Sequence, residues 1–255
     1  MGPITLTLLC VCSCLVTGTA LGIKDLKTAT RYIEERIFSR HNNQYAYFVK
    51  FTPDECDNGL QEEDVRAALG DTTRNEVILS LCRIYKGTRM VAAAPLQGIE
   101  INGKIGNVHS EYRLLDGGDN SPIGSLLRSP PRAGCVLFFS LNSPCVETCT
   151  RPGGRYNIIK MLDNTQGLPT DISNRAFIFR NVFHHDMGKD ISTWATLNHV
   201  FPLFRCNNNQ CTKCFPNNVG DNTYYDNNNN LEDNKYHMEG FGCNNTIGSI
   251  RCLGN

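Results

Sequence analysis

Residues 135–149 read CVLFFSLNSPCVETC, and this stretch carries most of the information about the fold. Its first seven residues, Cys135–Leu141, form a nearly continuous apolar run, which is typical of a central strand covered on both faces. Because such a strand needs helices above and below it, the run predicts an α/β fold. Two cysteines, Cys145 and Cys149, follow the strand and are the first candidates for chemistry.

The segments on either side alternate between helix and strand patterns. Apolar residues recur every three or four positions over residues 24–40, which predicts a helix, and alternate over residues 45–51, which predicts a strand. This order favours a sheet sandwiched between two helical layers. The other expected elements are a helix at 61–69 ended by Gly70, strands at 77–85, 89–94 and 176–183, a helix at 109–116 capped by Asn107, and a helix at 190–201.

Composition narrows the class of protein. The chain has 255 residues with 25 basic and 25 acidic side chains, so its formal net charge is zero. Neutrality argues against a general basic coat for nucleic acid, although it leaves a local basic groove open. A hydrophobic share of 40% is enough for a packed core. No internal apolar run is long enough to cross a bilayer, which disfavours a membrane-spanning protein.

The first 22 residues contain no charged side chain. An apolar stretch from Ile4 to Val16, followed by small residues up to Ala20, predicts a signal peptide over residues 1–22. A buried N-terminal helix or a membrane anchor is the alternative. Cleavage would make the protein secreted and extracellular, where cysteines normally form disulfides.

Of the 13 cysteines, ten remain after this cleavage. Their pairing cannot be deduced from the sequence, and a bridge between Cys56 and Cys82 is one candidate. After Phe204 the composition becomes polar, with 13 Asn among the 39 residues 207–245. We therefore expect a folded domain over residues 23–204 and an Asn-rich extension over residues 205–255 that disulfides hold together.

One group of residues could carry chemistry. His109 and Glu111 open the helix expected at 109–116, and Cys145 and Cys149 follow the apolar strand. One imidazole and two thiolates suit a tetrahedral Zn²⁺ with one open position. Zinc in such a site lowers the pKa of a bound water toward neutrality. Glu111 can then accept a proton from that water and pass it to a leaving nitrogen.

These residues resemble a known family. His-x-Glu (His109, Glu111) followed by Pro-Cys and a second Cys is the signature of the zinc nucleobase deaminases. Ser143-Pro144-Cys145 after a hydrophobic strand is most similar to the AID/APOBEC branch. Together with the signal peptide and the extra cysteines, it makes the chain resemble the secreted AID/APOBEC-like cytidine deaminases of animals, over roughly residues 24–204.

The resemblance implies a cytidine deaminase-like three-layer α/β/α fold with a five-stranded mixed sheet. It implies Zn²⁺ bound by His109, Cys145 and Cys149, with Glu111 as the proton shuttle. It further implies conversion of cytosine to uracil in single-stranded DNA or RNA, in immune defence against foreign nucleic acid.

The same resemblance assigns Phe183, His184 and His185 to reading the nucleotide next to the target base, on which their rings could stack. An exposed polar loop with Phe183 buried is the alternative. Asn142 and Ser143 are further candidates for substrate contact. Three arginines, Arg155, Arg175 and Arg180, are candidates for phosphate contacts.

The chain departs from the family in two ways. Three residues separate Cys145 from Cys149, whereas the family has two. A pair four apart still shares one helical face, although the Arg151-Pro152-Gly153-Gly154 segment should break that helix. Asn142 replaces the Trp that precedes Ser-Pro-Cys in the polynucleotide-acting branch, which removes a stacking surface for a base. A free cytidine or nucleotide therefore remains an alternative substrate.

Other interpretations stay open. The protein could be a non-catalytic secreted zinc-binding module, or Cys145 and Cys149 could form a disulfide. The polar extension offers the same ligand types in reverse order, Cys211-x-x-Cys214 and His237-Met238-Glu239. No apolar strand or helix start frames these residues, so disulfides are the simpler interpretation of the extension.

Overall fold

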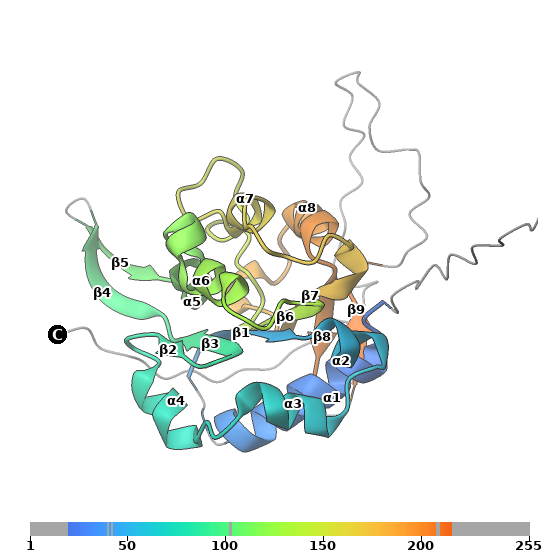
Figure 1. Ribbon diagram of the computed structural model, residues 1–255. Helices are drawn as coiled ribbons and strands as arrows, with labels where there is room; N and C mark the ends of the chain where they lie inside the picture. The colour runs from blue at the N-terminus through green and yellow to red at the C-terminus, as the bar shows by residue number, and fades with distance from the viewer. Residues whose placement is uncertain (1–19, 40, 42, 102–103, 208–209, 216–255) are drawn as a thin grey trace, which may run out of the picture.

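A seven-stranded mixed sheet runs through the middle of the molecule (Figure 1). The computed structural model describes residues 20–39, 41, 43–101, 104–207 and 210–215. In spatial order the strands are β2 (Tyr85–Lys86), β3 (Met90–Ala93), β1 (Ala46–Phe51), β6 (Cys135–Asn142), β7 (Arg175–Asn181), β8 (Leu203–Cys206) and β9 (Cys211–Lys213). β6 pairs antiparallel with β1 and parallel with β7, and β7 pairs parallel with β8.

The number of strands differs from the five that the family resemblance implied. The five central strands from β3 to β8 match that number, and β2 and β9 add one short strand at each edge. Strands of two and three residues are too short to produce a recognisable alternation of apolar and polar side chains. Only the pairing with a neighbour in the folded sheet reveals them.

Helices cover both faces of the sheet, as the order of the elements predicts (Figure 1). Leu137 and Phe139 of β6 pack into one core, and Val136 and Phe138 pack into the other. This confirms that the apolar run is a central strand covered on both faces. One layer contains α1 (Ile23–Ile33), α2 (Pro53–Asp57), α3 (Glu62–Leu69) and α4 (Arg74–Ser80), and the other contains α5 (Ser110–Leu115), α6 (Pro122–Arg128), α7 (Ile158–Asp163) and α8 (Ser192–Val200).

Most of the expected elements are confirmed. The helix expected at 24–40 is α1, continued by a π-helix over Glu34–Phe38. The helix expected at 61–69 is α3, which ends at Gly70 with a φ of 58°. The strands expected at 45–51, 89–94 and 176–183 are β1, β3 and β7, and the helix expected at 190–201 is α8.

The strand predicted at residues 77–85 is wrong. Most of this segment belongs to α4 or the turn after it, and only its last residue lies in β2. A reciprocal cap explains the helix: Thr73 Oγ1 accepts from the Glu76 backbone N–H at 3.3 Å, and Glu76 Oε2 accepts from the Thr73 N–H at 2.8 Å. This cap satisfies backbone donors of the first turn, which outweighs the strand preference of the apolar residues that follow.

A two-stranded ribbon of β4 (Leu96–Ile101) and β5 (Lys104–Val108) projects from the body of the molecule (Figure 1). It leads directly into α5 and was not expected from the sequence. Asn107 lies within β5, so the prediction that it caps this helix is wrong. His109 is the N-cap residue instead.

The described residues contain two disulfides. Cys56 is bonded to Cys135, 79 positions away, so the expected bridge from Cys56 to Cys82 is wrong. Cys206 is bonded to Cys211, which joins β8 to β9 and brings the start of the polar extension into the sheet. The domain limits expected at residues 22 and 204 stay predictions.

Residues 1–19 of the expected signal peptide and residues 216–255 of the extension lie outside the described residues. So does the His237-Met238-Glu239 segment. Within the part of the chain that the structure describes, no helix is both long and apolar enough to span a membrane.

A buried carboxyl group lies between the first helical layer and the sheet. Glu34 is 7% exposed, and its Oε2 accepts from Tyr45 Oη at 2.5 Å and from Arg180 Nη2 at 2.7 Å. Burial raises the pKa of Glu34 to about 7, although Arg180 and Tyr45 act in the opposite direction. Burial raises the pKa of Tyr47, and the charge of Glu34 raises it further.

We expect Glu34→Gln to flatten the dependence of the unfolding free energy on pH. The folded-state pKa of Glu34 lies above its ordinary value of 4.5, so the folded state binds this proton more tightly. Its contribution to stability is therefore complete below about pH 4.5 and is lost as the pH rises through about 7. Urea unfolding at about pH 5 and about pH 8 measures how far the unfolding free energy falls between these two pH values. This fall should be larger in the wild type than in Glu34→Gln by on the order of 2 kcal/mol. Equal losses in both proteins would contradict this assignment.

Candidate metal centre

His109, Cys145 and Cys149 come from the ends of two elements. His109 joins β5 to α5, and both cysteines lie in the segment after β6. The helix that would put Cys145 and Cys149 on one face is limited to a single turn, in which the Cys149 N–H donates to the Cys145 carbonyl at 2.9 Å. The Arg151-Pro152-Gly153-Gly154 segment follows this turn and is not helical, as expected.

These three side chains, called the ligand group below, meet at one point. His109 Nδ1 lies 3.1 Å from Cys149 Sγ and 3.3 Å from Cys145 Sγ, and the two sulfurs are 3.6 Å apart. Tetrahedral zinc, with Zn–S bonds of about 2.3 Å and Zn–N bonds of about 2.0 Å, requires S···S and N···S distances of about 3.8 and 3.6 Å. The observed distances approach these values, so the ligand group could hold a metal ion of this size.

This structure excludes two alternatives to the ligand group, namely a disulfide between Cys145 and Cys149 and a metal site that uses Cys211. A disulfide requires about 2.0 Å between sulfurs, which the 3.6 Å separation of Cys145 and Cys149 excludes. Cys211 is bonded to Cys206 and so cannot be the thiolate that a site in the extension would need. Among the described residues, the ligand group is the one set of three or more metal-binding side chains that lie close together.

The electrostatics of the ligand group favours a thiolate. A hydrogen bond with Cys149 lowers the pKa of Cys145 to about 4, and His109 adds to this effect. Burial lowers the pKa of His109, but its hydrogen bond and charge interaction with Cys145 outweigh burial and raise that pKa to about 9. The bond to Cys145 and burial raise the pKa of Cys149. A divalent cation would displace the protons that these three side chains share.

Glu111 lies buried beside the ligand group, with 2% of its surface exposed. Burial raises its pKa, while the charge of His109 and a hydrogen bond from Ser140 act in the opposite direction. The Glu111 charge in turn adds to the raised pKa of Cys149. A buried carboxyl group beside a metal-bound water is the kind of group that accepts a proton and passes it on.

Sequence reasoning missed the residues that hold the Cys145–Cys149 turn in place. Trp194 Nε1 donates to the Pro144 carbonyl at 2.9 Å, and Asp186 Oδ2 accepts from the Val146 N–H at 3.1 Å. Both residues are 1% exposed, and burial raises the pKa of Asp186 to about 6. The sequence alone indicates only a core tryptophan and a loop aspartate. Their hydrogen-bond partners lie 40 or more positions away, so no local pattern connects them to the cysteines.

Asn142 and Ser143 connect this segment to its neighbours. The Asn142 backbone N–H donates to Gln44 Oε1 at 3.1 Å. Ser143 is 3% exposed, and its Oγ accepts from the Phe183 N–H at 2.9 Å. Ser143 thus ties the cysteine segment to the loop after β7. A direct contact of Asn142 or Ser143 with substrate stays a prediction.

Phe183, His184 and His185 follow β7 at the surface. His184 and His185 are exposed, and Phe183 is half-buried with its ring centroid 5.0 Å and 5.2 Å from theirs. Three neighbouring rings at the surface suit stacking on a base. Their role in substrate recognition stays a prediction.

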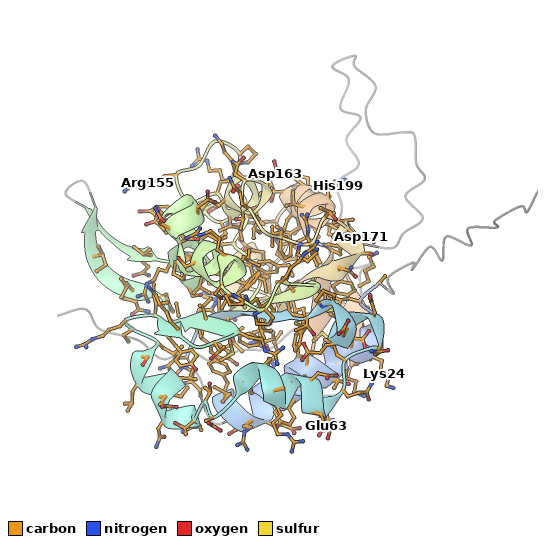
Figure 2. All side chains as sticks on the ribbon, viewed as in Figure 1. Lys24, Glu63, Arg155, Asp163, Asp171 and His199 are labelled. Carbon is orange, nitrogen blue, oxygen red and sulfur yellow. A yellow bond between two sulfur atoms is a disulfide. The ribbon has the colours of Figure 1, made fainter. Side chains whose placement is uncertain are left out.

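Two of the three candidate phosphate-binding arginines have partners inside the protein. Arg175 Nε donates to the Pro169 carbonyl at 2.8 Å, and Arg180 pairs with Glu34. Arg155 is exposed and lies on the outside of the second helical layer (Figure 2). Its guanidinium lies 5.7 Å from the centroid of the Tyr156 ring, and a phosphate contact of Arg155 stays a prediction.

Comparison with known families identifies the family of the chain. The family model described as Secreted Novel AID/APOBEC-like Deaminase 2 matches residues 26–225, well over half of the chain. The matched region begins in α1, ends beyond β9, and includes the ligand group and Glu111. Searches of curated proteins and of solved structures found no match.

Proposed function

Because the chain belongs to the Secreted Novel AID/APOBEC-like Deaminase 2 family, we propose that it is a secreted zinc-dependent deaminase that converts cytosine to uracil in single-stranded DNA or RNA. One observation carries this proposal. His109, Cys145 and Cys149 lie close enough together to share one metal ion, and the buried carboxyl group of Glu111 interacts electrostatically with all three. A closed structural zinc site would need no carboxylate in this position.

The residues of this chain have separable parts in the proposed reaction. Zn²⁺ bound by the ligand group would supply the Lewis acidity that makes water nucleophilic at neutral pH. Glu111 takes a proton from the attacking water and passes it to the exocyclic nitrogen of the base. That nitrogen leaves as ammonia, and the ring carbon gains a carbonyl oxygen from the water. Trp194 and Asp186 hold the cysteine turn and so keep both sulfurs in position.

Secretion is supported by the description of the family and by the disulfides Cys56–Cys135 and Cys206–Cys211, which are typical of oxidising compartments. A secreted cytosine deaminase would meet nucleic acid outside the cell. From the resemblance to the secreted AID/APOBEC-like deaminases, we propose that this activity serves immune defence against foreign nucleic acid.

A free cytidine or nucleotide is the second candidate substrate. Asn142, at the end of β6, offers no aromatic surface on which a base could stack, and the zero net charge provides no general attraction for phosphates. Both features suit a small substrate better than a polynucleotide.

We expect zinc-loaded protein to convert cytosine to uracil in single-stranded oligonucleotides, with binding that weakens steeply as salt is added. The assay compares DNA and RNA oligonucleotides of one sequence with free cytidine, and an oligonucleotide with thymine at every cytosine position serves as the control. Activity on cytidine alone would favour the second candidate. Bound zinc without activity on any of these substrates would contradict the proposal and favour a non-catalytic zinc module.

A further inference from the structure

A buried hydroxyl interrupts the apolar strand β6. Ser140 is fully buried, and every other side chain from Cys135 to Leu141 is apolar. A buried hydroxyl must find hydrogen-bond partners or destabilise the fold. Ser140 Oγ lies 2.6 Å from Glu111 Oε1 and 2.9 Å from Gln44 Nε2. The hydroxyl therefore connects Gln44, just before β1, to the Glu111 carboxyl group that is proposed to move the proton.

The direction of these hydrogen bonds follows from Gln44. The Asn142 backbone N–H can only donate, so the Gln44 atom 3.1 Å from it must be the amide oxygen. The amide nitrogen then faces Ser140 Oγ and can only donate to it. The single hydroxyl proton of Ser140 is left for Glu111 Oε1, which accepts it.

The sheet holds both residues in place. Ala46 pairs with Ser140 in the antiparallel register of β1 and β6, and the Leu141 N–H donates to the Tyr45 carbonyl at 3.0 Å. This register places Gln44 opposite Asn142. Ser140, like Phe138 two positions before it, faces the helical layer that contains Glu111. The support of the carboxyl group thus comes from residues that the pairing of β1 with β6 brings together.

We propose that Gln44 and Ser140 are positioning residues of the deamination, acting as a hydrogen-bonded pair that holds the Glu111 carboxyl group in its reactive orientation. This inference rests on the proposed function. With Oε1 occupied by the Ser140 proton, Oε2 becomes the oxygen that exchanges protons with water and base. Ser110 Oγ donates to Oε2 only from the longer distance of 3.1 Å.

Ser140→Ala should lower kcat by about ten- to a hundred-fold with KM unchanged, because the substrate still binds but the proton acceptor is misplaced. Ser140→Thr keeps the hydroxyl and should recover most of the activity. The matched control is Ser121→Ala, which removes an equally buried hydroxyl that caps α6 by accepting from the Gly124 N–H. It should lower stability without changing kcat.

Gln44→Glu tests the direction of the bonds at a half-buried position, where folding is less at risk. The new carboxylate presents an acceptor where the amide donated, so it draws the Ser140 proton away from Glu111. We expect kcat to fall as in Ser140→Ala. The double variant Gln44→Glu/Ser140→Ala should lower kcat by less than the product of the two separate fold-reductions.

Urea unfolding supplies a measurement that needs no activity. The midpoint shifts of Ser140→Ala and Glu111→Gln should be non-additive when combined, whereas those of Ser121→Ala and Glu111→Gln should add. Unchanged kcat in Ser140→Ala, or additive midpoint shifts for Ser140 and Glu111, would overturn the inference while the wild type stays active. A zinc-loaded wild type without any deaminase activity would instead overturn the proposed function, and this inference with it.

Discussion

Replacing Glu111 by alanine is expected to reduce cytosine deamination by about 10²–10⁴-fold without changing the zinc content. Removal of the carboxyl group leaves the attacking water and the leaving nitrogen without a group to transfer the proton between them. The ligand group keeps all of its donor atoms, since Glu111 is not among them. Rates of uracil formation and metal analysis of the same preparation measure both halves of this expectation.

Glu147→Ala is the matched control. Glu147 lies between the two cysteines in sequence, but its side chain is 72% exposed and pairs with Lys189 at the surface. We expect its removal to leave the rate nearly unchanged. Wild-type activity in a zinc-bound Glu111→Ala variant would contradict the role assigned to this carboxyl group.

Cys145→Ser is expected to abolish stoichiometric zinc binding and, with it, all activity. A serine hydroxyl keeps its proton at neutral pH and does not replace a thiolate as a ligand. The wild type should contain one zinc ion per chain, and added zinc should raise its unfolding temperature because the metal binds only the folded state. Both effects should disappear in the variant.

Cys211→Ser is the control for this substitution. It removes a cysteine whose sulfur is bonded to Cys206 and is therefore not a ligand. We expect this variant to be less stable but to keep its zinc. Loss of zinc in Cys211→Ser together with its retention in Cys145→Ser would place the metal in the polar extension instead.

Much of the candidate site is predictable from the sequence because its side chains come from two short segments. His109 and Glu111 are two positions apart, and Cys145 and Cys149 are four apart, so each pair depends on local structure alone. The apolar run before Cys145 indicates where its strand ends. That the two pairs meet depends on how the sheet is assembled, and the structure brings His109 Nδ1 within 3.1 Å and 3.3 Å of the two sulfurs.

The residues that surround the ligand group were not predictable in this way. Gln44 meets Ser140 across 96 positions, and Trp194 meets Pro144 across 50. Neither pair leaves a spacing or a periodicity that could be recognised. The same holds for Cys56, whose partner Cys135 follows from the position of α2 beside the start of β6.

The error at α4 has a different origin. Apolar residues from Val77 onward have strand character, but the Thr73–Glu76 cap, which begins four positions earlier, stabilises a helix over them instead. The signal was present as a Thr-x-x-Glu pattern. The edge strands β2 and β9, by contrast, are too short to be visible in any pattern.

Periodicity, capping and the spacing of chemically active side chains were determined by the order of the amino acids, since each depends on neighbours within a few positions. They specified an α/β fold, a central apolar strand and the types of ligand. Tertiary structure alone decided the disulfide partners, the two extra strands and the hydrogen bonds that hold Glu111. These are pairings between distant segments, and their geometry exists only once the sheet has set which strands lie side by side.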